Sequence, residues 1–246
     1  MKEKDVKKIV KDSYSKIAKK EKSCCCKDNI DEKNIAKAIG YSEEDINKVS
    51  EANLGLGCGN PIAHANIRQG DTVLDLGCGA GFDCFLAANK VGISGKVIGV
   101  DMTKEMIEKA RNLANKYNYN NVEFRLGDIE SLDIRDDSID IIISNCVINL
   151  APDKLKVFKE GYRILKKTGK MYVSDIVLLE KLTDEQRNNK ELIAGCVGGA
   201  LLKDEYLKNI TDANFRYKIL DEDRNISKKQ YQGINLESLK VELFKN

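Results

Sequence analysis

The segment from Asp75 to Gly81 reads Asp-Leu-Gly-Cys-Gly-Ala-Gly, and it separates a short apolar run, residues 72–76, from a helix-like segment, residues 82–90. Three glycines at every second position let the backbone turn sharply and pass close beneath a ligand. A strand, a glycine turn and a helix in this order are typical of α/β sheets that bind ligands outside the carboxyl ends of their strands. The segment therefore favours an α/β fold with a nucleotide-like ligand at the turn.

The alternation of strands and helices continues along the chain. The expected strands are 72–76, 96–101, 122–126, 139–144 and 170–177, and the expected helices are 82–90, 103–117 (with Thr103 as its cap) and 154–165. Near-continuous apolar strands fit a sheet that is buried on both faces. The pattern predicts a Rossmann-like, doubly wound, mostly parallel sheet.

Two smaller regions flank this predicted ligand-binding domain, which spans residues 53–178. Residues 1–52 predict an N-terminal helical segment in two pieces with a cysteine cluster between them, and Ser42 is expected to cap a helix start. Residues 57–61, Gly-Cys-Gly-Asn-Pro, are expected to form a loop. The C-terminal region, 179–246, predicts a small α+β unit, with helices over 183–194 and 203–213 and strands over 216–220 and 239–244.

Composition argues against several classes of protein. Lys plus Arg number 41 and Asp plus Glu 39, so a net charge of +2 gives no electrostatic reason for nucleic acid or a membrane surface as partner. No apolar run approaches the roughly 18 residues that a membrane span needs. The charged N-terminus, Met1 to Lys11, lacks the apolar core of a secretory signal. We expect a cytoplasmic protein, and the balanced charge favours a monomer.

Two carboxylates complete the predicted ligand site. Asp101 ends the second strand, where a carboxylate can hold two ribose hydroxyls. Asp128 and Ile129 follow the third strand, where the acid can accept from an adenine amino group and the isoleucine can pack on the ring. The glycine spacing, GxGxG, differs from the GxGxxG of dinucleotide enzymes. A generic nucleotide-binding fold with another ligand is the alternative.

The combination of glycine loop and two spaced acids resembles the class I methyltransferases that depend on S-adenosylmethionine (SAM), over residues 71–178. The resemblance implies SAM as cofactor, with Asp75 and Gly77 near its amino acid part, Asp101 on the ribose, and Asp128 with Ile129 on the adenine. The cofactor-binding residues predicted on this basis are Asp75, Gly77, Cys78, Gly79, Gly81, Asp101, Met102, Gly127, Asp128, Ile129 and Asn145.

The chain has eight cysteines, and they indicate which group accepts the methyl group of SAM. Cysteines in a cytosolic enzyme more often take part in metal binding or catalysis than in disulfides. Thiolates are soft ligands that select soft, thiophilic centres. Trivalent arsenic binds three thiolates as a pyramid with a lone pair at its apex, so arsenic itself can attack a methyl group without a general base. This suits a chain that has a single histidine, His64, because a lone histidine is more often structural than a catalytic base. Cys78 and Cys84 are interpreted as small buried residues.

Three cysteine-containing segments carry a more specific resemblance. They are Asn-Leu-Gly-Leu-Gly-Cys58-Gly-Asn-Pro, Ser-Asn-Cys146-Val-Ile-Asn-Leu and Ala-Gly-Cys196-Val-Gly-Gly-Ala-Leu. These resemble the three cysteine motifs of arsenite methyltransferases, and the similarity covers roughly residues 13–215. The resemblance implies that Cys146 and Cys196 hold As(III). It makes Cys58 the third ligand, or a thiol that forms a disulfide with an N-terminal cysteine during turnover.

The chain departs from the family at the N-terminal cysteines. A triple, Cys24 to Cys26 followed by Lys27, replaces the usual pair followed by glycine, which leaves the disulfide partner open between Cys25 and Cys26. Asp128 stands where the family commonly has Glu, and no known motif follows Phe215. The predicted catalytic residues are Cys58, Cys146, Cys196 and Cys26, the first three as As(III) ligands. The implied partners are arsenite as a glutathione-like thiol conjugate and a thioredoxin-type reductant.

Other functions remain open on the sequence alone. The chain could be a SAM-dependent carbon or oxygen methyltransferase of a quinone or another small molecule, in which case Cys146 and Cys196 would be dispensable. It could also bind or sense arsenic without turnover, although such a protein needs no SAM site. The triple Cys24 to Cys26 could hold zinc or copper, although structural zinc prefers paired spacings such as CxxC.

Overall fold

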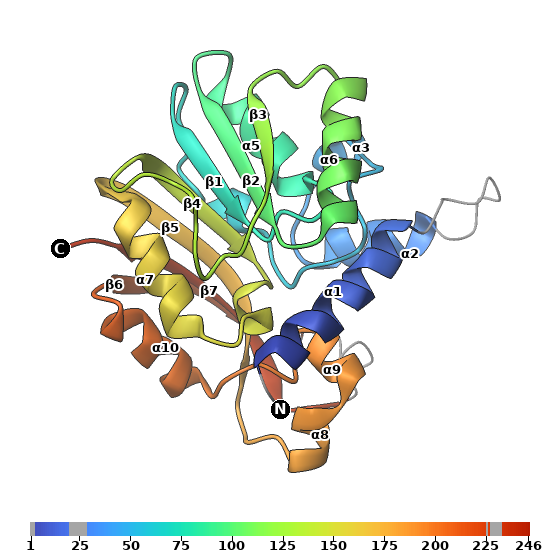
Figure 1. Cartoon of the computed structure of the whole chain (residues 1–246), viewed down its shortest axis with the longest axis vertical. Coiled ribbons are helices and arrows are strands. Elements are labelled where there is room, and N and C mark those ends of the chain that lie inside the picture. Colours follow the sequence, from blue (N-terminus) through green and yellow to red (C-terminus); the bar gives the residue numbers. More distant parts are fainter. Residues whose placement is uncertain (1–2, 20–28, 225, 227–232) are drawn as a thin grey trace.

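A single seven-stranded sheet organises the part of the chain that the computed structural model describes, which is residues 3–19, 29–224, 226 and 233–246 (Figure 1). The strand order is β3-β2-β1-β4-β5-β7-β6. The strands are β1 (Thr72–Leu76), β2 (Lys96–Asp101), β3 (Val122–Leu126), β4 (Ile139–Asn145), β5 (Leu165–Leu178), β6 (Arg216–Asp223) and β7 (Leu236–Phe244). The first five pair in parallel, and β7 runs antiparallel between β5 and β6. The predicted Rossmann-like, mostly parallel sheet is confirmed.

Helices flank the sheet and extend beyond it. They are α1 (Glu3–Lys19), α2 (Asn29–Ala38), α3 (Glu43–Lys48), α4 (Pro61–His64), α5 (Phe82–Val91), α6 (Lys104–Lys116), α7 (Lys154–Ile164), α8 (Asp184–Asn188), α9 (Lys190–Ala194) and α10 (Lys203–Asp212), with a 3₁₀ turn, η1 (Ile148–Leu150). The predicted cap at Ser42 is confirmed, since its side chain accepts from the Asp45 amide and begins α3. None of the helices in these described stretches is both long and apolar enough to cross a bilayer.

Two expectations about the helices were wrong. The segment 183–194 is not one helix, because the Asn189 side chain accepts from the amides of Glu191 and Leu192 and so starts a second helix, α9. The N-terminal region holds three described helices instead of two pieces. Of the predicted loop 57–61, Pro61 already belongs to α4, which Asn60 caps by accepting from the Ala63 amide.

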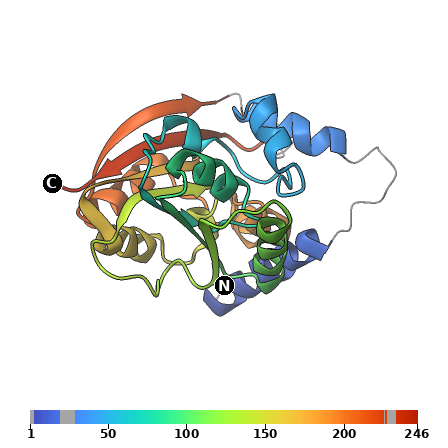
Figure 2. The same ribbon diagram turned by 90° about the horizontal axis from the view of Figure 1, so that it is seen from above.

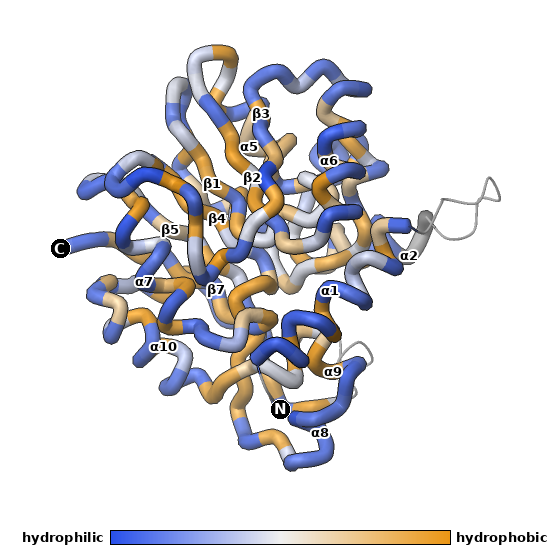
Figure 3. Tube along the Cα trace, in the orientation of Figure 1, coloured by the Kyte–Doolittle hydropathy of each residue, from blue (hydrophilic) through white to orange (hydrophobic). Residues whose placement is uncertain are grey.

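The core lies on both faces of the sheet, as the apolar strands predicted. Neighbouring residues of one strand point to opposite faces, so Val73 packs in one apolar cluster with α5 and α6, and Leu74 packs in another with α7 and α10. Figure 3 shows the same division, with apolar segments along the strands and hydrophilic segments on the outer helices. Polar groups therefore concentrate at the strand ends, where the site lies.

Helix α1 joins the sheet domain to the C-terminal region. It packs against α6 of the sheet domain and against α9, and it also contacts η1, which follows β4 (Figures 1 and 2). A third apolar cluster forms around this junction and contains Val10 of α1 together with Cys58, Cys146 and Cys196. The sequence places these three cysteines far apart, and the fold brings them together beneath α1.

Candidate active site

The glycine turn after β1 forms one wall of a pocket. The amides of Gly77 and Cys78 donate to the carbonyl of Val100 at 2.8 and 3.0 Å, which fixes the turn against the end of β2. Gly77 has a φ of 66°, and a Cβ there would meet the Val147 side chain at 2.2 Å. A Cβ on Gly79 would meet no atom within 4 Å, so this part of the turn faces open space. The turn is thus fixed from behind and open toward a ligand.

The pocket encloses an empty volume of about 1050 Å³, part of it open to solvent, which is enough for a nucleoside-sized ligand. Nine of the predicted cofactor residues line it: Asp75, Gly77, Cys78, Gly79, Asp101, Met102, Asp128, Ile129 and Asn145. Gly81 and Gly127 do not line it. Gly81 begins α5 in a left-handed conformation, and the Gly127 amide donates to the Asp101 carbonyl, so both shape the backbone behind the pocket.

Asp101 lines the pocket at the end of β2, and its predicted role on the ribose stays a prediction. Its carboxylate accepts from the amides of Thr103 at 2.7 Å and Gly79 at 3.0 Å, and burial raises its pKa. Burial also raises the pKa of Asp75 well above its usual range, with the charge of Asp83 acting in the same direction. Carboxylates in a largely apolar pocket suit a ligand that carries hydroxyl groups and positive charge, so the residues present fit SAM.

Asp128 has a partner that the sequence did not suggest. The Lys7 ammonium of α1 donates to Asp128 Oδ2 at 2.6 Å and to the buried Glu130 at 2.5 Å. The other carboxylate oxygen of Asp128 accepts from the Glu130 amide. An adenine amino group at Asp128 Oδ2 would have to share this contact with Lys7, and the adenine role of Asp128 stays a prediction.

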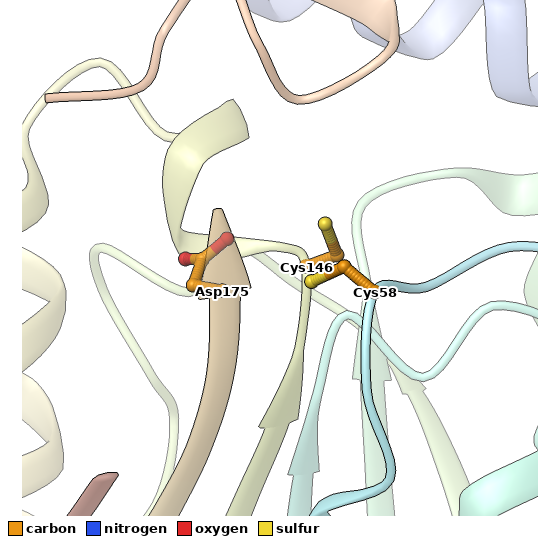
Figure 4. Close-up of side chains that lie close together, drawn as sticks. All are labelled: Cys58, Cys146 and Asp175. Atoms are coloured by element: carbon orange, nitrogen blue, oxygen red, sulfur yellow. The ribbon is translucent and has the colours of Figure 1, made fainter. Parts of the chain in front are cut away.

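Three of the four predicted catalytic cysteines meet beside this pocket. Cys146 lines the pocket itself, and its thiol lies close enough to those of Cys58 and Cys196 for both to shift its pKa. The sulfurs of Cys58 and Cys146 and a carboxylate oxygen of Asp175 all lie within 4.8 Å of one another (Figure 4). The Cys196 thiol donates to the Cys146 carbonyl at 2.7 Å. Cys26 belongs to residues 20–28, outside the described part of the chain.

The backbone at two of these cysteines is unusual. Cys146 and Cys196 have φ values of 59° and 67°, in the left-handed region. Among the described residues other than glycine, the remaining ones with positive φ are Asn118, Asp137 and Asn214, which are types that tolerate this region. A cysteine held there costs about 1–3 kcal/mol, and such residues cluster at functional sites. The fold therefore stabilises a costly placement of these two thiols.

The thiols are protonated when no ligand is bound. Burial raises the pKa of Cys58. The hydrogen bond with Cys196 lowers the pKa of Cys146, but the bond with Cys58 and burial outweigh it and hold that pKa well above its usual range. The hydrogen bond with Cys146, followed by burial, raises the pKa of Cys196 well above its usual range too. A ligand that binds as a thiolate complex must therefore displace three protons.

Asn145 connects the cysteine site to the pocket. Its Oδ1 accepts from the Cys58 amide at 3.2 Å, and its Nδ2 donates to the Gly59 carbonyl at 2.8 Å and to the Tyr41 hydroxyl at 2.9 Å. A Cβ on Gly57 would collide with this amide at 2.9 Å. Asn145 thus lines the pocket as predicted, and it also holds the loop that carries Cys58.

Replacing Asn145 with alanine is expected to weaken binding of As(III), the ligand that the resemblance of the cysteine motifs implies, by about tenfold, because leaving buried backbone groups of the Cys58 loop unpaired costs about 1–3 kcal/mol each. Equilibrium dialysis of the reduced protein with arsenic detection measures this. Asn209→Ala, which removes an exposed amide on α10, is the matched control and should change little. Unchanged affinity in Asn145→Ala would show that the loop holds its position without this side chain.

Asp175, near the end of β5, was missed by the sequence reasoning. It is fully buried, and its carboxylate accepts from the Tyr206 hydroxyl at 3.0 Å, the Asn149 amide group at 2.8 Å and its neighbour's backbone amide. Burial raises its pKa to about 7. The available signal was an acid near the carboxyl end of an otherwise apolar strand, which is where α/β sheets place functional groups.

The raised pKa of Asp175 predicts a pH effect on stability. A carboxyl group with a folded pKa near 7 and an unfolded pKa near 4 stabilises the fold fully below pH 4, and this contribution is lost as pH rises through 7. Between pH 5 and 8 the wild type should lose about 2 kcal/mol of unfolding free energy relative to Asp175→Asn. Urea unfolding of both proteins at each pH measures the difference. A difference that is independent of pH would show that Asp175 is ionised throughout.

Further residues line the pocket without having been predicted. Tyr14 of α1 lies with its hydroxyl 4.0 Å from the Cys196 sulfur, and Tyr41 donates to Asp83 at 2.7 Å. Burial raises the pKa of Asp83 to about 6. Asp83 had a local signal, since it is an acid in the first turn of the helix after the glycine loop. The tyrosines had none, because their segments reach the pocket only through the tertiary fold.

Comparison with known proteins agrees with this geometry. Residues 67–214 match the family model described as a methyltransferase domain. The YcgJ protein of Bacillus subtilis, at 22% identity and a TM-score of 0.61 over 75% of this chain and 96% of that one, shares the fold. Fold and pocket together define a class I methyltransferase domain, whose cofactor is SAM.

The relatives narrow the class further. The arsenic(III) SAM methyltransferase of Chlamydomonas reinhardtii is 33% identical with a TM-score of 0.69, over 86% of this chain and 73% of that one. The arsenite methyltransferases of Halobacterium salinarum and Homo sapiens are 43% and 45% identical over 86% and 52% of this chain. This chain belongs to the arsenite methyltransferase family. Its matches span 57% and 37% of the length of those two relatives.

Proposed function

We propose that this protein transfers the methyl group of SAM to trivalent arsenic held by Cys58, Cys146 and Cys196. The observation that carries the proposal is the convergence of three buried thiols at the wall of the cofactor pocket, with Cys146 shared by both. Three soft thiolates match the pyramidal coordination of As(III), and no general base is needed for a nucleophile that has its own lone pair. The family relationship supports the same reaction.

Arsenic would enter as a conjugate with glutathione or a similar thiol. Each protein thiol gives its proton to a departing thiolate as its own sulfur bonds to arsenic, so three exchanges leave the charge balanced. The raised pKa values of the cysteines keep the free site protonated and neutral, which avoids three buried charges before the substrate arrives. Burial of the three sulfurs also protects the arsenic–sulfur bonds from water.

SAM supplies an electrophilic methyl group on a positively charged sulfur. The protein supplies position, because the fixed pyramid aims the arsenic lone pair at that methyl group. Methylation takes arsenic to the pentavalent state. An N-terminal thiolate, from Cys25 or Cys26, would then attack the Cys58 sulfur. This forms a disulfide, and the two electrons of the broken As–S bond return arsenic to the trivalent state. A thioredoxin-type reductant would restore both thiols.

The need for reduced thiols favours the cytoplasm as the compartment in which the protein acts. The three cysteines must be reduced to bind arsenic, and the five described cysteines are free. Cytoplasmic thiols are kept reduced by glutathione and thioredoxin. We therefore propose that the protein acts in the cytoplasm, as a monomer and without nucleic acid or membrane as partner.

The second candidate is a carbon methyltransferase of a quinone. The demethylmenaquinone methyltransferase of Lactococcus lactis is 36% identical over 42% of this chain and 43% of that protein. The costly left-handed backbone at Cys146 and Cys196 disfavours this candidate, because a quinone needs no thiol. An arsenic-binding protein without turnover is the third candidate, and the open cofactor pocket disfavours it.

The test is single-turnover methylation. Reduced protein is mixed with SAM, arsenite and glutathione, and methylarsenicals are separated by chromatography with arsenic detection. Parallel reactions contain Cys196→Ser protein, or a demethylated quinone in place of arsenite. Methylated arsenic from the wild type and none from the variant support the proposal. Product from the quinone alone would move the function to the second candidate, and arsenite binding without any product would move it to the third.

A further inference from the structure

Asp175 adds a fourth donor to the three-thiol site. Its carboxylate oxygen lies within 4.8 Å of the sulfurs of both Cys58 and Cys146 (Figure 4). All three residues are buried. Trivalent arsenic does not need this group, because three thiolates and a lone pair complete its pyramid. The donor set therefore exceeds what arsenic requires.

We propose that this pocket also binds a divalent thiophilic cation of the Zn²⁺ type, held by Cys58, Cys146, Cys196 and Asp175. Zinc has no lone pair and takes four ligands as a tetrahedron, with cysteine sulfur at about 2.3 Å and carboxylate oxygen at about 2.0–2.2 Å. Ligand atoms of such a tetrahedron lie about 3.5–3.8 Å apart. The Cys58 and Cys146 sulfurs and the Asp175 oxygen, which lie within 4.8 Å of one another, need to approach by up to about 1 Å. The Cys196 sulfur lies outside this group, and its side chain must also rotate toward the cation.

The surroundings of Asp175 suit a metal ligand. The Tyr206 hydroxyl donates to Oδ2, and the Asn149 amide group and a backbone amide donate to Oδ1. Ligating carboxylates are commonly held by such hydrogen bonds, which fix their orientation. Oδ2 accepts this one hydrogen bond, which leaves a lone pair for a cation. The buried ammonium of Lys154 attracts the Asp175 charge and would reduce the excess negative charge of a complex with three thiolates.

The same three thiols would then have two alternative ligands, which differ in whether they also use the Asp175 carboxylate. A divalent ion and arsenite would compete for the same three sulfurs, and only the divalent ion would use the carboxylate. Zinc in the pocket would exclude arsenite until a thiol conjugate of arsenic displaces it. This inference does not depend on methyl transfer, since it concerns a second ligand of the same thiols.

Titration of the reduced protein with Co²⁺ tests the proposal, with neither arsenic nor SAM present. Cobalt substitutes for zinc and reports sulfur ligation by its near-ultraviolet charge-transfer band and tetrahedral geometry by its visible bands. The wild type should bind one Co²⁺, which Zn²⁺ displaces. Asp175→Asn should bind it at least about tenfold more weakly, while its affinity for arsenite stays within about twofold. Asp140→Asn, at the opposite end of β4 from Cys146, is the matched control and should bind Co²⁺ like the wild type.

A second variant, Asp175→Cys, is expected to strengthen the cobalt charge-transfer band, whereas Asp175→Asn weakens Co²⁺ binding. Asp175→Cys would offer four sulfurs, so its charge-transfer band per bound Co²⁺ should exceed that of the wild type by about a third, in proportion to the sulfur count. No Co²⁺ binding by the wild type, equal affinity in Asp175→Asn, or an unchanged band in Asp175→Cys would each overturn the proposal. A protein that methylates no arsenic can still pass this test, so it is independent of the proposed reaction.

Discussion

Replacing Cys146 with serine is expected to lower arsenite affinity by at least about a hundredfold, which corresponds to about 2.7 kcal/mol. Cys146 is the central thiol of the site, since its sulfur lies within 4.8 Å of that of Cys58 and its carbonyl accepts from the Cys196 thiol. A serine hydroxyl is a hard ligand that does not replace a thiolate on soft arsenic. Two remaining thiols would hold arsenic without the third bond that completes the pyramid. Equilibrium dialysis with arsenic detection measures the change.

A matched control separates this effect from the general loss of a cysteine. Cys84→Ser alters a buried thiol on α5 that donates to Asp75 at 3.2 Å and lies outside the three-thiol site. Arsenite affinity should stay within about threefold in this variant, because no arsenic ligand is lost. Retained tight binding by Cys146→Ser, with native circular dichroism, would mean that arsenic binds elsewhere in the chain.

The sheet was predictable because each of its parts has a local signal. Apolar runs such as 139–144, glycine turns and helix caps follow one another, and the right-handed βαβ rule leaves few ways to arrange them. The break at Asn189 was missed because residues 183–191 are all polar, so no apolar pattern marks where one helix ends and the next begins. Only the geometry shows that this side chain caps the second helix in preference to staying in the first. The hydrogen bonds of the Asn189 side chain mark the break between the two helices, and the sequence pattern does not.

The candidate site was only partly predictable. The residues of the glycine turn and the strand ends lie at the carboxyl edge of the sheet, so their convergence follows from the fold. Lys7 and Asp128 are 121 residues apart, and one lysine in a Lys-rich helix carries no sign of such a contact. The left-handed backbone at Cys146 had no signal either, since that conformation favours glycine and asparagine. Such features depend on tertiary contacts that sequence spacing does not encode.

Replacing Asp101 with alanine is expected to weaken SAM binding by about a hundredfold. The loss has two physical parts. The ribose hydroxyls lose a buried carboxylate acceptor, and hydrogen bonds to a charged group are worth about 1.5–3 kcal/mol each. The amides of Gly79 and Thr103 also lose their partner, so the glycine turn is no longer tied to the end of β2 through this side chain. Isothermal titration calorimetry with SAM measures the affinity.

Two control variants are compared with Asp101→Ala for their SAM affinity. Asp101→Asn keeps one oxygen acceptor and should lose about tenfold, less than alanine, because a neutral acceptor binds hydroxyls more weakly. Asp212→Ala removes an exposed acid that pairs with Lys208 on α10, and surface pairs contribute little, so SAM affinity should not change. The three thiols do not contact Asp101, so Asp101→Ala should still bind arsenite. Wild-type SAM affinity in Asp101→Ala would place the ribose elsewhere in the pocket, whereas loss of both ligands would show that the substitution disrupts the fold shared by the two sites.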